Sequence, residues 1–287
     1  MLPLVLSLLI AVAPAGTSRQ VDITAAARAL QPGEVVLLTI RTAAAVDELR
    51  ARAFDRELLP WRVEATTWQV LVGIDLNTSP GRHPVSVDAG PNGRARYDLE
   101  VVGKAFPTRR LTVAPSYVDP PPEVQDRIVR EANRLNAIWR SAVAEPLWTG
   151  PFIRPVPHDA NSAFGSRSVF NGQPRSPHGG ADFLSPAGTP IAAPAGGRVV
   201  LAGDLYYTGG TVVIDHGVGL ISLVAHLSSI DVADGTVVNA GDVVGKVGAT
   251  GRVTGAHLHW TVRLGGARVD PLSLLAVLGP GGSVPSR

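Results

Sequence analysis

The segment His257-Leu-His-Trp-Thr-Val-Arg-Leu264 alternates polar and apolar side chains along its length. Successive side chains of a β-strand point to opposite faces, so both histidines and Thr261 share one face while Leu258 and Trp260 occupy the other. One face of such a strand belongs to a core, and the other is available for chemistry. Histidines at positions i and i+2 can offer neighbouring nitrogens to a metal ion and its supporting donor. A polar surface strand has the same pattern, so this segment alone leaves both interpretations open.

Further strands surround this segment, in a region from Pro146 onward that holds six of the seven histidines and no glutamate. Short apolar runs joined by Gly or Asp-Gly are typical of strands connected by hairpins. These runs cover residues 197–201, 210–214, 220–226, 236–238 and 242–247. We therefore expect an antiparallel β-sheet domain over residues 146–278, followed by a flexible tail over residues 279–287.

Alternating runs broken by turn residues also fill the first part of the chain, at residues 33–40, 68–74, 83–87 and 97–101. The sequence Pro91-Asn-Gly93 favours a hairpin between the last two, because Asn-Gly accepts the positive φ angles of a tight turn. This pattern predicts an Ig-like β-sandwich over residues 16–105. The predicted fold class is thus mainly β, with an N-terminal β-sandwich, a helical linker and a C-terminal antiparallel sheet domain.

Residues 106–145 are expected to form the linker between these two domains. Three prolines at 120–122 stiffen it, and apolar residues then recur at three- and four-residue spacing from Val124 to Ala142. That spacing predicts an amphipathic helix. The helix is expected to join the two domains, although a helix that binds a partner would carry the same stripe.

The first 15 residues carry no charged side chain and end on Ala13-Pro-Ala15, a small-x-small pattern that is typical of a secretory signal peptide. The alternative is a short membrane anchor, but the apolar run falls short of the roughly 20 residues that cross a bilayer. We therefore expect an exported protein, periplasmic or secreted, with no stable membrane span in its mature form.

Composition excludes several classes of protein. The chain has 287 residues, a formal net charge of +2 and no cysteine. A charge so close to zero gives no electrostatic basis for holding a phosphate backbone, so nucleic acid is not an expected partner. Without cysteine there is no disulfide framework, no thiolate zinc site and no thiol nucleophile. Any metal site must use His, Asp or Glu.

Two more elements carry candidate chemistry. His178 and Asp182 flank a pair of glycines, which let the backbone turn tightly so that both side chains can converge. His226 ends the apolar run of residues 220–226. Taken singly, the first pair could be two solvated loop residues, and the third could be a hydrogen-bonded core histidine. Their co-occurrence with the His257 strand makes a common site the better interpretation.

Together these motifs resemble those of the lysostaphin-type (M23 or LytM-like) zinc metallopeptidases. The likeness rests on His178-x-x-x-Asp182, on Ala225-His226-Leu-Ser228 and on His257-Leu-His259, and it covers roughly residues 161–275. The resemblance implies one zinc ion per chain, bound by His178, Asp182 and His259. It also implies that His226 and His257 are catalytic histidines beside the metal, and that the substrate is the peptide part of bacterial peptidoglycan.

The chain departs from the common family pattern at three positions: Ala256, where Pro is often found, Val224, where an aromatic residue is common, and Thr261, where Glu is frequent. Each departure bears on groove shape and substrate preference, because none removes an implied ligand or catalytic histidine.

Three protein ligands leave a fourth coordination position for water, as in catalytic zinc sites. Since no glutamate follows Glu145, the carboxylate base of His-Glu-x-x-His peptidases has no local counterpart, and histidine must move the protons. We expect one of His226 and His257 to act as the base, with His257 preferred. The resemblance thus predicts a zinc metalloendopeptidase that hydrolyses peptidoglycan cross-links.

The remaining polar candidates have weaker interpretations. His158 and His216 are expected to be turn histidines without a role in the site. Tyr206 and Tyr207 could line a peptide groove or simply cover the sheet.

Other functions compete with the peptidase. A non-catalytic LytM-like regulator on the same fold would bind cell wall or activate a partner hydrolase, but degenerate ligands would favour it and all five positions are intact. Residues 235–247 resemble half of a biotinyl or lipoyl carrier barrel, which would not explain the histidines. A serine hydrolase would need a Gly-x-Ser-x-Gly elbow, which the sequence lacks.

Overall fold

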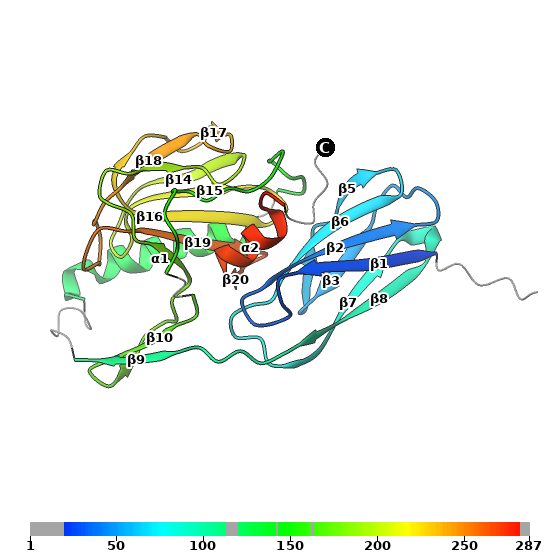
Figure 1. The fold of residues 1–287 in the computed structure, drawn as a ribbon, viewed down its shortest axis with the longest axis horizontal. Coiled ribbons are helices and arrows are strands. Elements are labelled where there is room, and N and C mark those ends of the chain that lie inside the picture. The colour runs from blue at the N-terminus through cyan, green and yellow to red at the C-terminus, as the bar shows by residue number, and fades with distance from the viewer. Residues whose placement is uncertain (1–19, 113–119, 142, 162–163, 282–287) are drawn as a thin grey trace, which may run out of the picture.

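The computed structural model describes residues 20–112, 120–141, 143–161 and 164–281 (Figure 1). The predicted leader lies outside these ranges, and so does the predicted tail apart from residues 279–281. The chain is mainly β, which confirms the predicted fold class. Two sheets pack together in the N-terminal half, and one larger antiparallel sheet forms the C-terminal half.

The N-terminal β-sandwich consists of two four-stranded sheets whose facing apolar side chains form one core. The first sheet has the order β1-β2-β6-β5, with bounds Val21–Ala27, Val35–Thr42, Thr67–Gly73 and Trp61–Glu64. The second has the order β4-β3-β7-β8, with bounds Arg56–Leu58, Arg50–Ala53, Gly81–Asp88 and Arg94–Val101.

The turn between β7 and β8 differs in detail from the expected two-residue hairpin. Residues 89–93 form the loop, and Gly90–Asn92 adopts a 3-10 turn. Only Gly93 of the Asn-Gly pair has a positive φ, of 88°. The side chain of Asn92 instead exchanges hydrogen bonds with the backbone of Ala44. The asparagine therefore serves a contact between loops, and the glycine alone supplies the turn conformation.

Strand β2 is buried on both of its faces. Val36 and Leu38 belong to the sandwich core, whereas Val35 and Leu37 pack into the core of the C-terminal half. This explains why the sequence shows a continuous apolar run here instead of strict alternation. The sandwich and the C-terminal half thus share one hydrophobic core across their contact.

The C-terminal half contains a nine-stranded sheet with the main order β12-β19-β16-β15-β14-β17. Every strand predicted from the sequence in this half is present, with ends that shift by a few residues. The bounds along this path are Gly180–Phe183, Leu258–Leu264, Leu220–Ile230, Gly209–Asp215, Gly197–Leu205 and Val237–Val238. Three further strands pair beside it, β13 (Pro190–Ala192), β18 (Val243–Val247) and β20 (Ala267–Val269).

Helix α1 (Gln125–Arg140) covers part of one face of this sheet. A 3-10 turn at Pro122–Val124 leads into it, and residue 142, where the predicted stripe ended, lies outside the described residues. The apolar stripe packs on the sheet through Leu135, Ile138 and Trp139. The apolar stripe of α1 therefore contacts the large sheet of the same chain, where it covers a patch that includes Leu223 and Ala225.

Helix α2 (Pro271–Leu278), which the sequence analysis did not identify, lies between the two halves (Figure 1). The carboxylate of Asp270 caps it by accepting a hydrogen bond from the amide of Leu272. The same carboxylate and that of Glu34 both accept hydrogen bonds from the guanidinium of Arg28, at 2.7 and 2.6 Å. An ion-pair network thus joins the sandwich to the start of α2.

A small separate sheet has the order β11-β10-β9, with bounds Gln173–Pro174, Arg167–Phe170 and Thr108–Leu111. Its β9 belongs to the linker that leaves the sandwich, and it runs below the C-terminal half in the view of Figure 1. Within the described residues, no helix combines the length and apolar character needed to cross a membrane.

Candidate metal centre

Strand β19 and the residue just before it present His259 and His257 on one face of the large sheet, as the alternation predicted. Leu258 and Trp260 are fully buried in the core. The side chains of His257 and His259 keep 19% and 15% of their surface exposed. These two imidazoles are therefore held by a rigid strand and remain accessible from one side.

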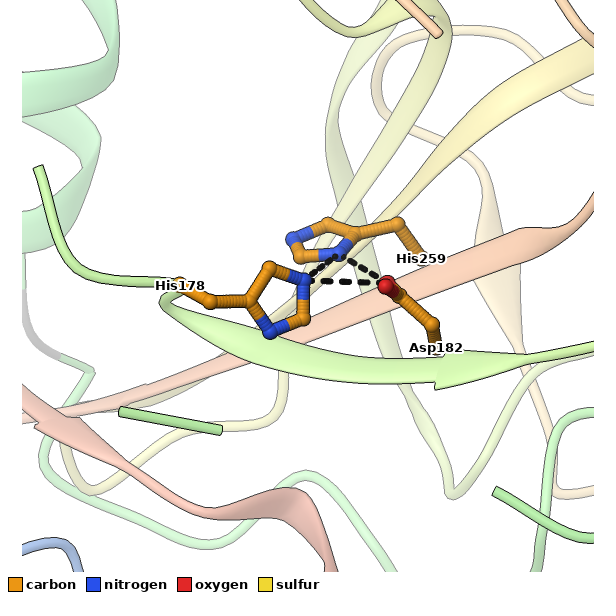
Figure 2. Close-up of side chains that lie close together, drawn as sticks. All are labelled: His178, Asp182 and His259. Atoms are coloured by element: carbon orange, nitrogen blue, oxygen red, sulfur yellow. Dashed lines mark hydrogen bonds and ion pairs between the residues drawn. The ribbon is translucent and has the colours of Figure 1, made fainter. Parts of the chain in front are cut away.

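Three side chains converge beside this strand (Figure 2). Strand β12 pairs with β19 so that Asp182 lies directly opposite His259, and His178 lies in the loop that leads into β12. Oδ1 of Asp182 is 3.0 Å from Nε2 of His178 and 2.8 Å from Nδ1 of His259. The two nitrogens are 3.1 Å apart. The structure thus brings together the three residues predicted as metal ligands.

The two glycines after His178 have a different purpose from the expected tight turn. Neither Gly179 nor Gly180 has a positive φ. A Cβ atom on Gly180 would lie 2.3 Å from the carbonyl oxygen of Trp260, whereas one on Gly179 would meet nothing within 4 Å. Gly180 is therefore required because β12 approaches the backbone of β19 closely.

Hydrogen bonds on the far side of each imidazole determine which ring nitrogen faces the site. Nε2 of His259 lies 2.9 Å from the hydroxyl of Thr261, which leaves Nδ1 toward Asp182. Nδ1 of His226 donates to the carbonyl oxygen of Thr250 at 3.0 Å, and Nδ1 of His257 donates to that of Gly255 at 2.9 Å. In the neutral form of either of these two rings, Nε2 is therefore the nitrogen with the lone pair.

His226 reaches the site because of a local irregularity in β16. The register between β15 and β16 shifts here, so that Ala225 and His226 together oppose one residue, which is a β-bulge. The backbone of His226 has a φ of 67°, in the left-handed region that non-glycine residues avoid. Its ring centroid lies 4.8 Å from that of His257 and 6.0 Å from that of His259. The bulge thus directs toward the site a side chain that regular alternation would turn away.

Burial and hydrogen bonding determine the charges in the site. Burial opposes ionisation of Asp182, but hydrogen bonds from His178 and His259 outweigh it and hold the pKa of the carboxyl far below its usual range. Burial lowers the pKa of His226 to about 4 and lowers the pKa of His259 as well. Both shifts favour the neutral form of His226 and His259 beside an ionised Asp182, and a carboxylate with a neutral imidazole is what metal binding requires.

His216 and His158 lie outside this cluster, in agreement with the expectation from the sequence. His216 is fully buried, where its Nδ1 donates to the carbonyl oxygen of Gly196 and its Nε2 accepts from the hydroxyl of Ser222. The same hydroxyl accepts from the indole of Trp260, so this network fixes the core side of β19. His158 bonds instead to the hydroxyl of Ser185.

The loop that contains Tyr206 and Tyr207 supports His226 from the backbone side. The carbonyl oxygen of Thr208 accepts from the amide of His226 at 2.8 Å, and that of Tyr207 accepts from the amide of Arg252. The amide of Tyr206 donates to the carboxylate of Glu131 on α1 at 2.7 Å. Sequence reasoning missed these supporting carbonyl groups, because backbone acceptors leave no signature in residue type.

Comparisons with known proteins agree on the family. A model of peptidase family M23 matches residues 176–271. A crystal structure from Pseudomonas aeruginosa, described as a candidate M23 peptidase, superposes with a TM-score of 0.68 and 37% identity and covers 86% of this chain and 95% of that one.

Two curated relatives match the C-terminal half. The DD-carboxypeptidase/endopeptidase Mpg of Neisseria meningitidis serogroup B is 43% identical over 97 residues, which are 34% of this chain and 22% of that protein. The peptidoglycan DD-endopeptidase ShyA of Vibrio cholerae is 41% identical over 97 residues, which are 34% of this chain and 23% of that protein. The match thus spans less than a quarter of the length of these relatives. Because the Pseudomonas structure is similar over nearly its whole length, the chain belongs to peptidase family M23.

Proposed function

We propose that this chain is an exported, zinc-dependent endopeptidase that hydrolyses peptide bonds in the cross-links of bacterial peptidoglycan. The observation that carries the proposal is the convergence of three donor atoms beside two histidines, His226 and His257, whose Nδ1 atoms are each bonded to a backbone carbonyl and whose rings lie 4.8 Å apart. Oδ1 of Asp182 lies within 3.0 Å of Nε2 of His178 and within 2.8 Å of Nδ1 of His259. Nε2 of His257 is 3.8 Å from the same carboxylate oxygen.

The donor set fits zinc. Two imidazole nitrogens and one carboxylate oxygen are ligands that zinc accepts, and atoms held about 2.0 Å from a tetrahedral ion lie about 3.3 Å from one another. The three atoms here are separated by 2.8 to 3.1 Å and would need to move apart only slightly. His178, Asp182 and His259 would therefore hold the ion, with a fourth position open to solvent.

Zinc at this position would supply Lewis-acid activation of water and of the scissile carbonyl group. His226 and His257 would handle the protons, since each has an Nε2 free to accept one and an Nδ1 anchored to a backbone carbonyl. The low pKa of His226, about 4, keeps this ring neutral in the resting protein. We therefore assign His257 as the base and His226 as a hydrogen-bond acceptor that orients the attacking water, because a neutral ring with its Nδ1 proton on Thr250 has no Nε2 proton to donate.

The substrate and the location follow from different observations. The Vibrio relative is named as a peptidoglycan DD-endopeptidase and the Neisseria relative as a DD-carboxypeptidase/endopeptidase, so a cell-wall peptide is the substrate class we assign. The uncharged apolar run of residues 1–15 supports export, to the periplasm or beyond, because peptidoglycan lies outside the cytoplasmic membrane. The absence of cysteine agrees with a site built from histidine and aspartate alone.

The test is a set of histidine variants, each measured for zinc content and for release of peptides from purified peptidoglycan by mass spectrometry. His178→Ala and His259→Ala should lose zinc and activity together. His226→Ala and His257→Ala should keep zinc and lose about 10²- to 10⁴-fold in rate. His158→Ala is the matched control and should keep both, because its ring contacts Ser185 outside the cluster.

Two results would overturn the proposal. If the zinc-loaded wild-type protein leaves the cross-links intact, the chain is not a peptidoglycan endopeptidase and the regulator becomes the better interpretation. If His226→Ala empties the metal site, the assignment of ligands is wrong.

A further inference from the structure

The hairpin formed by β10 and β11 is held by the interdomain linker and not by the large sheet. It forms a separate sheet in which the only other strand is β9, within the described residues. Residues 167–170 pair in parallel with residues 108–111. The amides of Arg167 and Asn171 donate to the carbonyl oxygens of Pro107 and Leu111, at 2.8 and 3.0 Å, at the two ends of this pairing.

This hairpin is connected directly to the backbone of His178. The amide of Gly165 donates to the carbonyl oxygen of His178 at 2.8 Å, and the amide of His178 donates to that of Ser166 at 2.9 Å. Both bonds are made immediately before β10 begins. The backbone position of His178 is therefore determined by residues that are themselves fixed by pairing with β9.

Aromatic packing joins the same residues to the linker and the sandwich. The rings of Phe106 and Phe164 meet edge to face with centroids 6.4 Å apart. A Cβ on Gly165, whose φ is 77°, would lie 2.2 Å from the ring of Phe106, and one on Gly33 of the sandwich would lie 2.4 Å from the ring of Phe164. Phe164 is thus enclosed by the linker on one side and by the sandwich on the other, and it is only 6% exposed.

The linker itself is anchored to the sandwich just before Phe106. The ammonium group of Lys104 lies 3.6 Å from the carboxylate of the buried Glu34, and the amide of Val102 donates to the carbonyl oxygen of Leu30. A continuous set of contacts therefore runs from the sandwich through Phe106 and β9 to Gly165 and His178.

We propose that the linker strand β9, with Phe106, is a positioning element that fixes the backbone of His178 beside Asp182 and His259. The sandwich would then contribute to the metal site without contacting it, by holding β9 in register. The part of this inference that concerns metal rests on the proposed function, whereas the part that concerns the order of the 164–178 segment does not.

A pair of proline variants tests the inference in the full chain. Carbonyl oxygens of residues 107 and 111 point to β10, so residue 109 also faces β10 and residue 110 faces away. Arg109→Pro removes an amide on the paired side, and Arg110→Pro removes one on the free side. Both replace one exposed arginine, so charge is matched.

Amide hydrogen exchange of metal-free protein is the first measurement. The amides of Gly165 and His178 should exchange about fivefold to tenfold faster in Arg109→Pro than in Arg110→Pro, since one pairing hydrogen bond is lost. Zinc affinity, measured by competition with a chelator, should fall by a similar factor in Arg109→Pro alone. If Arg109→Pro does not fold, Phe106→Ala removes the packing without touching the strand pairing and should change both readouts in the same direction.

Equal exchange rates in the two proline variants, or unchanged exchange in Phe106→Ala, would overturn the inference. A wild-type chain that binds no zinc would overturn the proposed function instead, and the exchange measurement would still decide the role of β9.

Discussion

The hydroxyl of Thr261 lies 2.9 Å from Nε2 of His259, while Nδ1 of the same ring lies 2.8 Å from Asp182. A neutral imidazole has one proton, so a ring that offers the lone pair of Nδ1 to a metal must donate from Nε2. With a metal ion on Nδ1 in place of the hydrogen bond to Asp182, Thr261 would accept that proton and favour the required tautomer. His259 and Thr261 project from the same face of β19, so one strand carries both the predicted ligand and the hydroxyl group that hydrogen-bonds to it.

Replacing Thr261 with Val should weaken zinc binding by about 10- to 100-fold, because the two side chains have nearly the same shape and only the acceptor is lost. Replacing it with Ser should restore most of the affinity. Chelator competition measures the affinity, and the tautomer of His259 can be followed by nitrogen NMR. A Thr261→Val protein with the affinity of the wild type would show that the hydrogen bond has no part in holding the metal.

At position 226, Gly should give a more stable protein than Ala, by about 1 kcal/mol, although neither variant has an imidazole. The reason is the φ of 67°, which costs a residue with a Cβ about 1 kcal/mol or more and costs glycine nothing. Denaturant unfolding of metal-free protein measures the difference. Ala225→Gly, one residue earlier in the same strand, is the control and should destabilise instead. Two position-226 variants of equal stability would contradict the left-handed conformation.

His216 should make the fold sensitive to mild acid. Burial lowers its pKa to about 4 in the folded chain, compared with about 6.5 when unfolded. As pH falls below 6.5, this imidazole becomes protonated in the unfolded chain but stays neutral in the folded chain. The free energy of unfolding therefore decreases between about pH 6.5 and pH 4. This one group should remove about 2 kcal/mol between pH 7 and pH 5.

The measurement is the free energy of unfolding of metal-free protein at pH 7 and pH 5, for the wild type and for His216→Asn. The variant should be less stable than the wild type at pH 7, but its free energy of unfolding should decrease less between pH 7 and pH 5. His158→Ala keeps the buried imidazole of His216 and is the comparison. A pH dependence in His216→Asn as steep as that of the wild type would mean that other groups account for it.

Arg28→Met should destabilise the chain by about 2 kcal/mol, because the carboxylates of Glu34 and Asp270 would stay buried without their shared partner. The estimate is below that for a fully buried pair, since the side chain of Arg28 is 35% exposed. Arg82→Met, which breaks an exposed pair with Glu100, should leave the stability nearly unchanged, because solvent screens such a pair. Thermal and denaturant unfolding compare the two, and equal losses would contradict a special role for the interdomain network.

Side-chain periodicity was sufficient to predict much of the fold and two histidines of the site. The alternation over residues 257–264 placed His257 and His259 on one face, and the structure has them there. Apolar runs bounded by glycine predicted most strands of the large sheet, because a strand buried on both faces, such as β15, has a short continuous apolar run. The convergence of His178 and Asp182 on this strand needed the family motif in addition, because spacing within a loop does not determine where a side chain points.

The remaining features depend on long-range contacts that periodicity does not encode. Strand β9 consists of four exposed residues without an apolar face, and it becomes a strand only because β10 lies beside it. The bulge at His226 results from a shift in register between two strands. Helix α2 could have been found, since Asp270 followed by Pro271 is a cap and first-turn signal before an apolar run.

The double burial of β2 limits how this protein can be divided. Val35 and Leu37, together with Trp61 and Leu71 of the same sheet, complete a core whose other buried members lie from Phe152 onward. A cut between the sandwich and the linker would therefore leave uncovered apolar surface on both fragments. A catalytic fragment prepared for crystallisation, or grafted onto another binding module, would have to bring the first sheet of the sandwich with it. The two halves therefore have to be kept together when the protein is truncated or fused to another domain.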